Sequence, residues 1–344
     1  MVNQVKSYNK TFVFLTITLF LIFILNVSLG SVYIPIKQIL LSFIDGAVEK
    51  ESWKSIVLNY RFPKAITAII VGSGLSISGL LMQTLFRNPL AGPFVLGISS
   101  GASLGVAILI LGASFLGISL TSYAFSSWGQ AIAASLGSFM VLSAVMLAAV
   151  KVRNTMSILI IGLMFGSITS AVISVLAYFS SASQLQQFMF WSFGSLGNLS
   201  WEEIAALFIV FLIGISFVIF IIKPLNSMLL GENYAKSMGV NVRRTRNFTL
   251  IATSLLTGVI TAFSGPIAFV GLAVPHLTKL LFSTSNHRIL LPAVAICGAI
   301  IMLICDSIAQ LPNSEFTLPI NAITSLFGAP IIIWLLIRKR KINY

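Results

Sequence analysis

Few side chains in this sequence could support acid–base, nucleophilic or metal chemistry. The two histidines, His276 and His287, stand at opposite ends of a short segment, outside any H-E-x-x-H metal motif and without a cysteine cluster. No G-x-S-x-G nucleophile motif is present. No lysine followed by serine or threonine is preceded by the glycines of a nucleotide-binding P-loop. The sequence therefore predicts a protein that is not an enzyme, carries no cofactor or metal and does not bind ATP through that loop.

Ionisable residues inside the apolar segments are almost absent as well. Among lysine, arginine and acidic residues, only Lys279 and Asp306 lie inside such a segment rather than at its first residues. Ion-coupled secondary transporters, by contrast, carry charged relays at depth and show inverted repeats, and the sequence has no convincing internal repeat. A path lined by serine, threonine, glutamine, methionine and backbone groups suits a bulky or neutral solute better than a bare ion. An ion-coupled secondary transporter therefore stays only as the alternative from a different class.

The elements that would hold such a path are membrane-spanning helices. Hydrophobic residues make up 57% of the 344 residues and charged residues 8%, whereas a soluble domain carries about 25% charged residues. The stretch from Phe248 to Phe282 is too long for one span, so we expect breaks at Gly265-Pro266 and Pro275. The chain thus predicts an all-α membrane protein of about ten transmembrane helices. The apolar segments lie near residues 11–30, 63–83, 93–112, 129–150, 156–178, 203–222, 248–268, 269–283, 289–309 and 321–337.

The basic residues predict the orientation of these spans. The net charge is +13, and lysine and arginine collect on the cytoplasmic side of membrane proteins. Placing both termini in the cytoplasm leaves few basic residues outside, whereas the reverse orientation leaves most of them there. We therefore expect a single multi-pass domain over residues 1–344 in a bacterial cell (cytoplasmic) membrane. The lipid bilayer would surround it, and we expect no binding of nucleic acid. The basic residues left outside are Lys37, Lys50, Lys54, Arg61 and Lys64.

One predicted cytoplasmic connection is longer and more polar than the others. It covers about residues 229–246, reads as helix-compatible up to Met238 and is then interrupted by Gly239. Ala235 and Gly239 are four apart and would share one face of a helix, where small side chains permit close approach to a groove. A simple solvated loop and a platform for a cytoplasmic partner both remain open at this point.

Glycines recur at helical spacing in the third apolar segment. Gly97, Gly101 and Gly105 form two overlapping G-x-x-x-G motifs, and Gly162 and Gly166 repeat the pattern. Such motifs let membrane helices approach closely. We interpret them as helix-packing residues rather than as substrate contacts.

Several motifs, taken together in their order and spacing, resemble one known family. They resemble the permeases of type II ABC importers for iron–siderophore complexes, haem and cobalamin, and the resemblance covers about residues 10–341. The motifs are Arg61-Phe62-Pro63-Lys64, Gly79-Leu80-Leu81-Met82-Gln83, Arg87-Asn88-Pro89-Leu90-Ala91-Gly92-Pro93, Leu96-Gly97-Ile98-Ser99-Ser100-Gly101, Gly265-Pro266-Ile267-Ala268-Phe269-Val270-Gly271, Val274-Pro275-His276 and Gly328-Ala329-Pro330.

The resemblance implies the type II permease fold and a set of partners. A second permease subunit, identical or paralogous, would complete a dimer around the path. Two copies of a separate cytoplasmic ABC ATPase would hydrolyse ATP, and an extracytoplasmic substrate-binding protein would deliver the solute. A ferric siderophore is the expected substrate, with haem or cobalamin as the alternatives that the same family transports.

The resemblance also implies roles for individual residues. Arg61 and Lys64 match basic positions that dock the binding protein, although Lys64 replaces a frequent arginine and Gln310 stands where another arginine often follows Asp306. Asn154 and Thr155 match an inner loop that narrows the path and would serve as an inner gate. The residues that match the segment coupling the permease to the ATPase are Glu232, Ala235, Met238, Gly239 and Val240.

Overall fold

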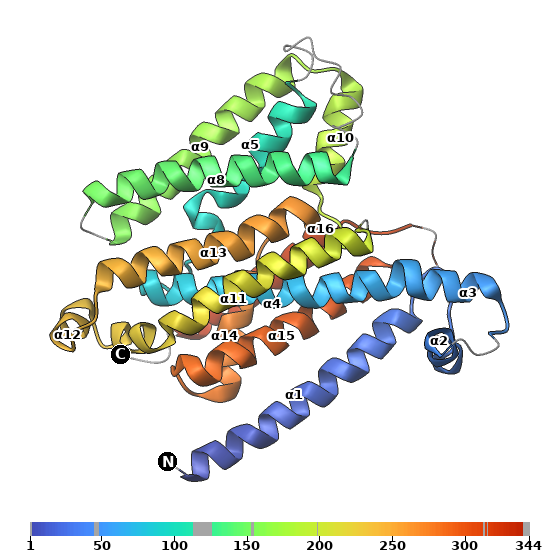
Figure 1. The fold of residues 1–344 in the computed structure, drawn as a ribbon, viewed down its shortest axis with the longest axis horizontal. Helices are drawn as coiled ribbons and strands as arrows, with labels where there is room; N and C mark the ends of the chain where they lie inside the picture. The colour runs from blue at the N-terminus through green and yellow to red at the C-terminus, as the bar shows by residue number, and fades with distance from the viewer. Residues whose placement is uncertain are drawn as a thin grey trace. The chain divides into compact units, whose positions relative to one another are not determined.

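The computed structural model of the protein describes residues 2–44, 48–112, 126–152, 155–197, 199–311, 314 and 316–339. Within these ranges the chain forms helices and connections, and no strand occurs. The prediction of an all-α protein is therefore confirmed, and Figure 1 shows the long helices that dominate it.

Each predicted apolar segment coincides with an apolar helix. In the described part of the chain, seven helical stretches are long and apolar enough to cross a membrane, and the remaining segments form shorter apolar helices. The long stretches are Tyr8–Ser28, Glu51–Phe86, Ser127–Ala148, Met156–Tyr178, Trp201–Leu229, Val242–Ser264 and His287–Ala309, and the shorter ones are Ile98–Ile110, Val270–Phe282 and Ile320–Trp334. The side of the membrane on which the termini lie stays a prediction.

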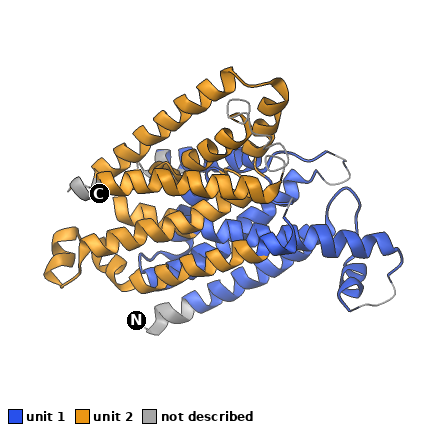
Figure 2. Ribbon diagram, turned by 45° about the horizontal axis from the view of Figure 1, so that its top comes forward, with its two compact units in different colours: residues 1–76, 195–204, 268–344 blue, residues 77–194, 205–267 orange. Residues whose placement is uncertain are grey.

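The described residues group into two compact units, which Figure 2 colours separately. Unit 1 contains residues 1–76, 195–204 and 268–344, and unit 2 contains residues 77–194 and 205–267. The chain passes between the units more than once, so neither unit is a continuous stretch of sequence. That residues 1–344 act as a single domain stays a prediction.

Unit 1 is built on α1 (Val2–Ser28), which packs against α15 (His287–Ala309). The helices α14 (Val270–Phe282) and α16 (Ile320–Lys339) pack on α15 and on each other. Between α1 and α4 (Phe62–Phe86) come α2 (Ile36–Phe43), α3 (Glu51–Ile56) and the π-helical turn η1 (Val57–Arg61). The backbones of α4 and α15 approach closely at one point, where an added Cβ at Gly72 would lie 2.2 Å from the Gly298 carbonyl oxygen.

Unit 2 is centred on α5 (Ile98–Ile110), which packs against α8 (Ser127–Lys151), α9 (Thr155–Tyr178), α10 (Ala182–Ser192) and α13 (Val242–Ser264). The short 3-10 helix η2 (Pro93–Leu96) precedes α5 and contacts α9. Small and medium apolar side chains of α5 and α8, among them Ala102, Val106 and Ala134, are fully buried in this core. The helices α11 (Trp201–Leu229) and α12 (Glu232–Ser237) lead into α13.

The long apolar stretch after Phe248 is divided once rather than twice. The helix α13 ends at Ser264, and Gly265 adopts a positive φ of 72° that a side chain would disfavour. Pro275, in contrast, lies inside α14 without ending it, so the break expected there is wrong. Proline removes one backbone hydrogen bond, and neighbouring helices in a membrane bundle let the helix continue.

Candidate functional site

The polar segment between α11 and α13 folds as a short helix with a defined end. After α12, the Val240 amide donates to the Ala235 carbonyl at 3.0 Å and the Gly239 amide donates to the Lys236 carbonyl at 2.9 Å. Gly239 has a φ of +81°. These two bonds and the left-handed glycine form a Schellman motif, which satisfies carbonyls that a helix end leaves free. The backbone conformation of this end therefore favours glycine, or asparagine, at position 239.

This conformation corrects the prediction that Ala235 and Gly239 share one helical face. Gly239 lies beyond the end of α12 and is exposed, whereas Ala235 is completely buried. The large apolar and aromatic side chains that the segment exposes on α12 and at its C-cap are Tyr234 and Met238, both more than half exposed. Glu232 and Val240 are half-buried. Whether these residues contact an ATPase stays a prediction.

Arg87, from the Arg87-Asn88-Pro89 motif, holds the start of the same segment in place. Its Nη2 atom donates to the Met228 carbonyl at 2.8 Å, at the end of α11. A cation is favourable there because the last carbonyls of a helix carry partial negative charge. The next glycine, Gly231, has a φ of +122° and turns the chain into α12. The motif thus has a structural role that the sequence analysis did not assign.

The predicted inner gate can be placed only in part. Asn154 lies outside the described residues, and so does the side chain of Thr155. The backbone of Thr155 begins α9. The gating role of both residues stays a prediction.

Arg61, a predicted docking residue, is buried and binds backbone carbonyls of its own chain. Its Nη1 atom donates to the carbonyls of Val27 and Ser28 at 3.0 and 2.8 Å, and Nη2 donates to the carbonyl of Val32. Val27 and Ser28 close α1, so the guanidinium caps the negative end of that helix. An added Cβ at Gly30 would lie 2.7 Å from Nη2, and a glycine there leaves room for the arginine.

Lys64, the other predicted docking residue, belongs to a network of buried polar groups. Its Nζ atom lies 3.0 Å from Oδ1 of Asp306, whose side chain is 2% exposed. Asn26 and Gln310 donate to Oδ2 of Asp306 at 2.9 and 2.7 Å. Asn26 also donates to the Leu303 carbonyl. The network therefore ties α1 and α4 to α15 within unit 1.

The two predicted docking residues thus differ in how far their side chains are exposed. Arg61 is 8% exposed, whereas the Lys64 side chain is 21% exposed and more accessible to a partner. A structural role explains Arg61 without any partner, and docking by both residues stays a prediction. Asn26 was not among the predicted site residues, and Gln310 stood out only as a departure from the family pattern. An acidic residue that is alone in an apolar helix requires a polar partner. That rule, applied to Asp306, was the available signal for Asn26 and Gln310.

The predicted packing glycines lie where backbones approach closely. An added Cβ at Gly101 would be 2.6 Å from the Gly137 carbonyl oxygen, and one at Gly105 would be 2.0 Å from the Ala133 carbonyl oxygen. Gly97 precedes α5 with a φ of +72° and faces Gly162. A larger side chain at Gly101 or Gly105 would have to separate α5 from α8.

One feature of α13 was missed altogether. Threonines recur every four residues and are all buried, which places a row of hydroxyl groups along one face of the helix. Some bond along α13, as Thr249 does to the Thr245 carbonyl at 2.8 Å. The hydroxyls of Thr253 and Thr257 have no partner among the described residues. The four-residue repetition is visible in the sequence and was the available signal. The row consists of Thr245, Thr249, Thr253, Thr257 and Thr261.

These features define a helical membrane protein in which buried polar groups hold helices together. Among the described residues no group of histidine, cysteine or acidic side chains could hold a metal ion. Both cysteines, Cys297 and Cys305, are buried and unpaired. The segment around α12 exposes polar side chains together with Tyr234 and Met238.

Comparison with known proteins agrees with this class and gives its family. The sequence profile of the FecCD transport family matches residues 18–338, and the chain belongs to that family. It is 36% identical to the vitamin B12 import system permease protein BtuC of Citrobacter koseri over 287 residues, which is 83% of this chain and 84% of the relative. It is also 36% identical to the BtuC of Klebsiella pneumoniae over 281 residues, or 81% of this chain and 82% of the relative.

Solved structures show the same fold. An inward-facing ABC transporter described as of the metal-chelate type superposes with a TM-score of 0.83 at 29% identity, covering 96% of this chain and 99% of that one. PsaBC from Streptococcus pneumoniae matches with a TM-score of 0.52 at 17% identity, over 86% and 94% of the two chains, and supports the fold alone.

The class of the protein follows from the family. This chain is the permease of an ABC importer and a multi-pass protein of the cytoplasmic membrane. It is a transport protein, and the ATPase is a separate subunit. A permease of this class works together with that ATPase and with a second permease subunit.

Proposed function

We propose that this permease imports cobalamin. The observation that carries the proposal is the identity of 34–36% to several vitamin B12 import permeases, sustained over more than four fifths of the chain. This ranks cobalamin above the ferric siderophore expected from the sequence alone. A large corrinoid also suits spans that contain few charged groups.

An uptake assay tests the substrate. The chain is expressed with its ATPase and its binding protein in cells that lack their own cobalamin permease, and uptake of labelled cyanocobalamin is measured. We expect ATP-dependent accumulation, and none with an ATPase that cannot hydrolyse ATP. Uptake of a ferric hydroxamate with no uptake of cyanocobalamin would contradict the proposal.

An iron chelate is the second candidate. It is favoured by the match to a metal-chelate-type transporter at a TM-score of 0.83. The same assay separates the two, because each labelled substrate can be competed with an excess of the other. Haem is included as a third unlabelled competitor.

We infer a coupling role for the segment around α12. Tyr234 and Met238 are exposed next to a helix end that two backbone hydrogen bonds close, and a defined, exposed helix end is a suitable surface for a groove in a partner. The other roles expected from the resemblance, docking of a binding protein by Arg61 and Lys64 and gating by Asn154 and Thr155, are proposed on that resemblance.

Two substitutions at Gly239 test the coupling role. We expect Gly239→Arg to abolish transport and co-purification with the ATPase, because the long side chain would project from an exposed position into the space of the partner. The permease should still insert in the membrane, since a Cβ added at Gly239 has no atom of this chain within 4 Å. Gly239→Asn is the matched control, since asparagine tolerates a positive φ better than other residues and is smaller. Normal uptake by Gly239→Arg would count against the coupling role.

A further inference from the structure

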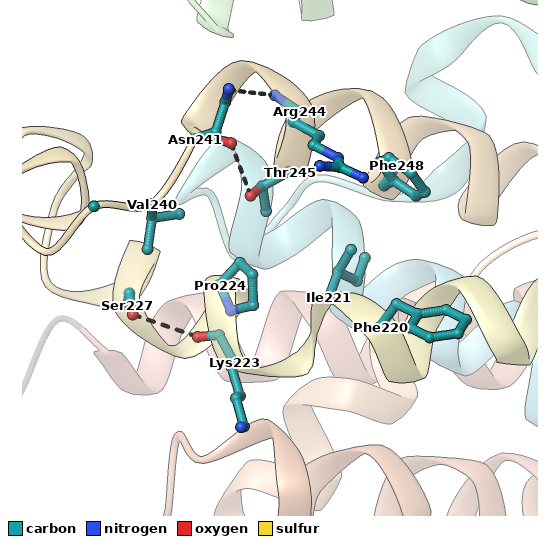
Figure 3. A pocket seen from close by; sticks show the side chains of 11 residues that line it. Phe220, Ile221, Lys223, Pro224, Ser227, Val240, Asn241, Arg244, Thr245 and Phe248 are labelled. Carbon is teal, nitrogen blue, oxygen red and sulfur yellow. Dashed lines mark hydrogen bonds between the residues drawn. The ribbon is translucent and has the colours of Figure 1, made fainter.

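A cavity of about 660 Å³ lies within unit 2, between the end of α11 and the start of α13. Its walls are mostly apolar, and Figure 3 shows Phe220, Ile221 and Phe248 along one side of it. Lys223 and Arg244 also line the cavity. Gly239 and Val240, which follow α12, complete it. The cavity therefore combines hydrocarbon walls with two cations.

The position of the cavity along α11 corresponds to the level of lipid headgroups. Trp201 begins α11, and Lys223 follows it by about 33 Å of helix at 1.5 Å per residue. A bilayer has a hydrocarbon core of about 30 Å, and tryptophan favours its interface. Lys223 thus falls at the opposite interface, and Phe220, which is 78% exposed, lies one turn deeper, at the level of the acyl chains.

The second helix shows the same order of charge and hydrocarbon. Arg244, which lines the cavity, stands in the first turn of α13, and the apolar part of the helix begins near Phe248. The Arg244 guanidinium lies 5.5 Å from the centre of the Phe248 ring. Both helices therefore present basic groups at the cavity mouth and aromatic rings farther into the membrane.

The two cations are available to a ligand. Lys223 and Arg244 are exposed, and neither forms an ion pair with a carboxylate in the part of the chain that the structure describes. Asn241 caps α13 by accepting the Arg244 amide at 2.9 Å, so the positive end of the helix dipole also faces this region. In Figure 3 the Lys223 ammonium points away from Arg244. Its flexible four-carbon stem must turn to bring both charges to one anion.

We propose that this cavity binds an anionic phospholipid of the adjoining leaflet. The phosphate would accept hydrogen bonds from Arg244 and Lys223, and an acyl chain would lie against Phe220 and Phe248. Basic pockets between membrane helices on the cytoplasmic side suit such headgroups, and the distribution of basic residues predicts that side for this end of α11. The lipid would rest against Gly239 and Val240 and so support the segment around α12. This inference goes beyond the transport function and does not depend on the substrate.

Lipid binding to the purified full-length chain tests the proposal. Binding of phosphatidylglycerol and of phosphatidylcholine is measured by native mass spectrometry after delipidation. We expect phosphatidylglycerol to be retained in preference, and its affinity to fall roughly thirtyfold in Lys223→Ala with Arg244→Ala, at about fivefold per basic residue near a membrane surface. The matched control, Lys236→Ala with Arg243→Ala, removes the same charge from exposed residues outside the cavity lining and should change the affinity less than twofold.

A second variant tests the cavity itself without changing its charge. Ser227 lines the cavity one helical turn beyond Lys223, on the side away from Phe220. Ser227→Trp should fill that end of the cavity and exclude the phosphate headgroup, so that phosphatidylglycerol binding falls as well. Glycerol phosphate at millimolar concentration should not displace the lipid, because the soluble headgroup lacks the apolar contacts.

Several results would overturn the proposal. An equal loss of phosphatidylglycerol affinity in the test and control double variants would mean a general charge effect. Phosphatidylcholine binding as tight as that of phosphatidylglycerol would show that the anionic headgroup is not recognised. Displacement by glycerol phosphate would indicate a site for a soluble anion. If the cavity variants lost the ATPase on purification but bound phosphatidylglycerol normally, the cavity would belong to the contact with the ATPase.

Discussion

Two regions of this protein hold their cations in opposite ways. In unit 1, Arg61 donates to backbone carbonyls that close α1, and Lys64 is paired with the buried Asp306. In unit 2, Lys223 and Arg244 are exposed at the ends of two helices, without a carboxylate partner among the described residues. The first arrangement uses positive charge to hold helices together, whereas the second leaves it available to other molecules.

The difference shows that a basic residue near a helix end is not by itself a sign of partner binding. Burial decides its role, because a buried charge must be paired and hydrogen-bonded, while an exposed charge contributes little to folding. Sequence position alone does not distinguish the two cases. The following predictions test this contrast, beginning with the largest expected effect on stability.

Arg61→Ala should have the largest effect. It leaves the carbonyls of Val27, Ser28 and Val32 without their donor, and we expect the free energy of unfolding to fall by about 4 kcal/mol, since hydrogen bonds to charged groups contribute about 1.5–3 kcal/mol each and are not additive. The measurement is reversible unfolding in lipid nanodiscs, followed by tryptophan fluorescence. Arg61→Lys should recover little of the loss, because an ammonium lacks the planar fork of arginine.

The opposite result at Arg61 would break the contrast. If Arg61→Ala left stability unchanged and abolished association with the binding protein, the residue would act in docking despite its burial.

Lys64→Ala should have a smaller effect, of about 3 kcal/mol, because it leaves the Asp306 carboxylate buried without its cation. Because the Lys64 side chain is partly exposed, water can reach the Asp306 carboxylate in the variant, and the loss of unfolding free energy is smaller than for a fully buried pair. Asp306→Asn in the Lys64→Ala background should restore part of the stability, since the double change removes both charges. A double-mutant cycle of unfolding free energies measures this coupling, and additive losses would exclude an energetically important ion pair.

Lys223→Ala together with Arg244→Ala should have the smallest effect, less than about 1 kcal/mol, because both side chains are exposed and the loss is limited to the contact between Arg244 and the Phe248 ring. The same unfolding measurement in detergent without lipid provides the test. A loss of unfolding free energy as large as that for Arg61→Ala would show that Lys223 and Arg244 stabilise the fold. The contrast between the two regions would then be wrong. The result also verifies that the lipid-binding variants remain folded.

Much of the fold could be predicted because its signals are local. Each of the apolar segments became a helix, and Gly265-Pro266 ends α13 as expected. The break at Pro275 was wrong because the tolerance of a helix for proline depends on the neighbours that surround it. Gly239 was recognised as an interruption, but its role as the left-handed residue of a helix end appeared only in the backbone conformation.

The sequence by itself determined the class of this protein: its solvent is lipid, its spans are helices, and its motifs match those of a permease. These properties follow from composition and from runs of apolar residues, which need no knowledge of long-range contacts. Only the tertiary structure decided that Arg61 caps α1, that Asn26 and Gln310 bind Asp306, and that Lys223 and Arg244 share a cavity. Asn26 and Asp306 lie 280 residues apart, and whether a polar group is buried and satisfied depends on which distant side chains the fold brings to it.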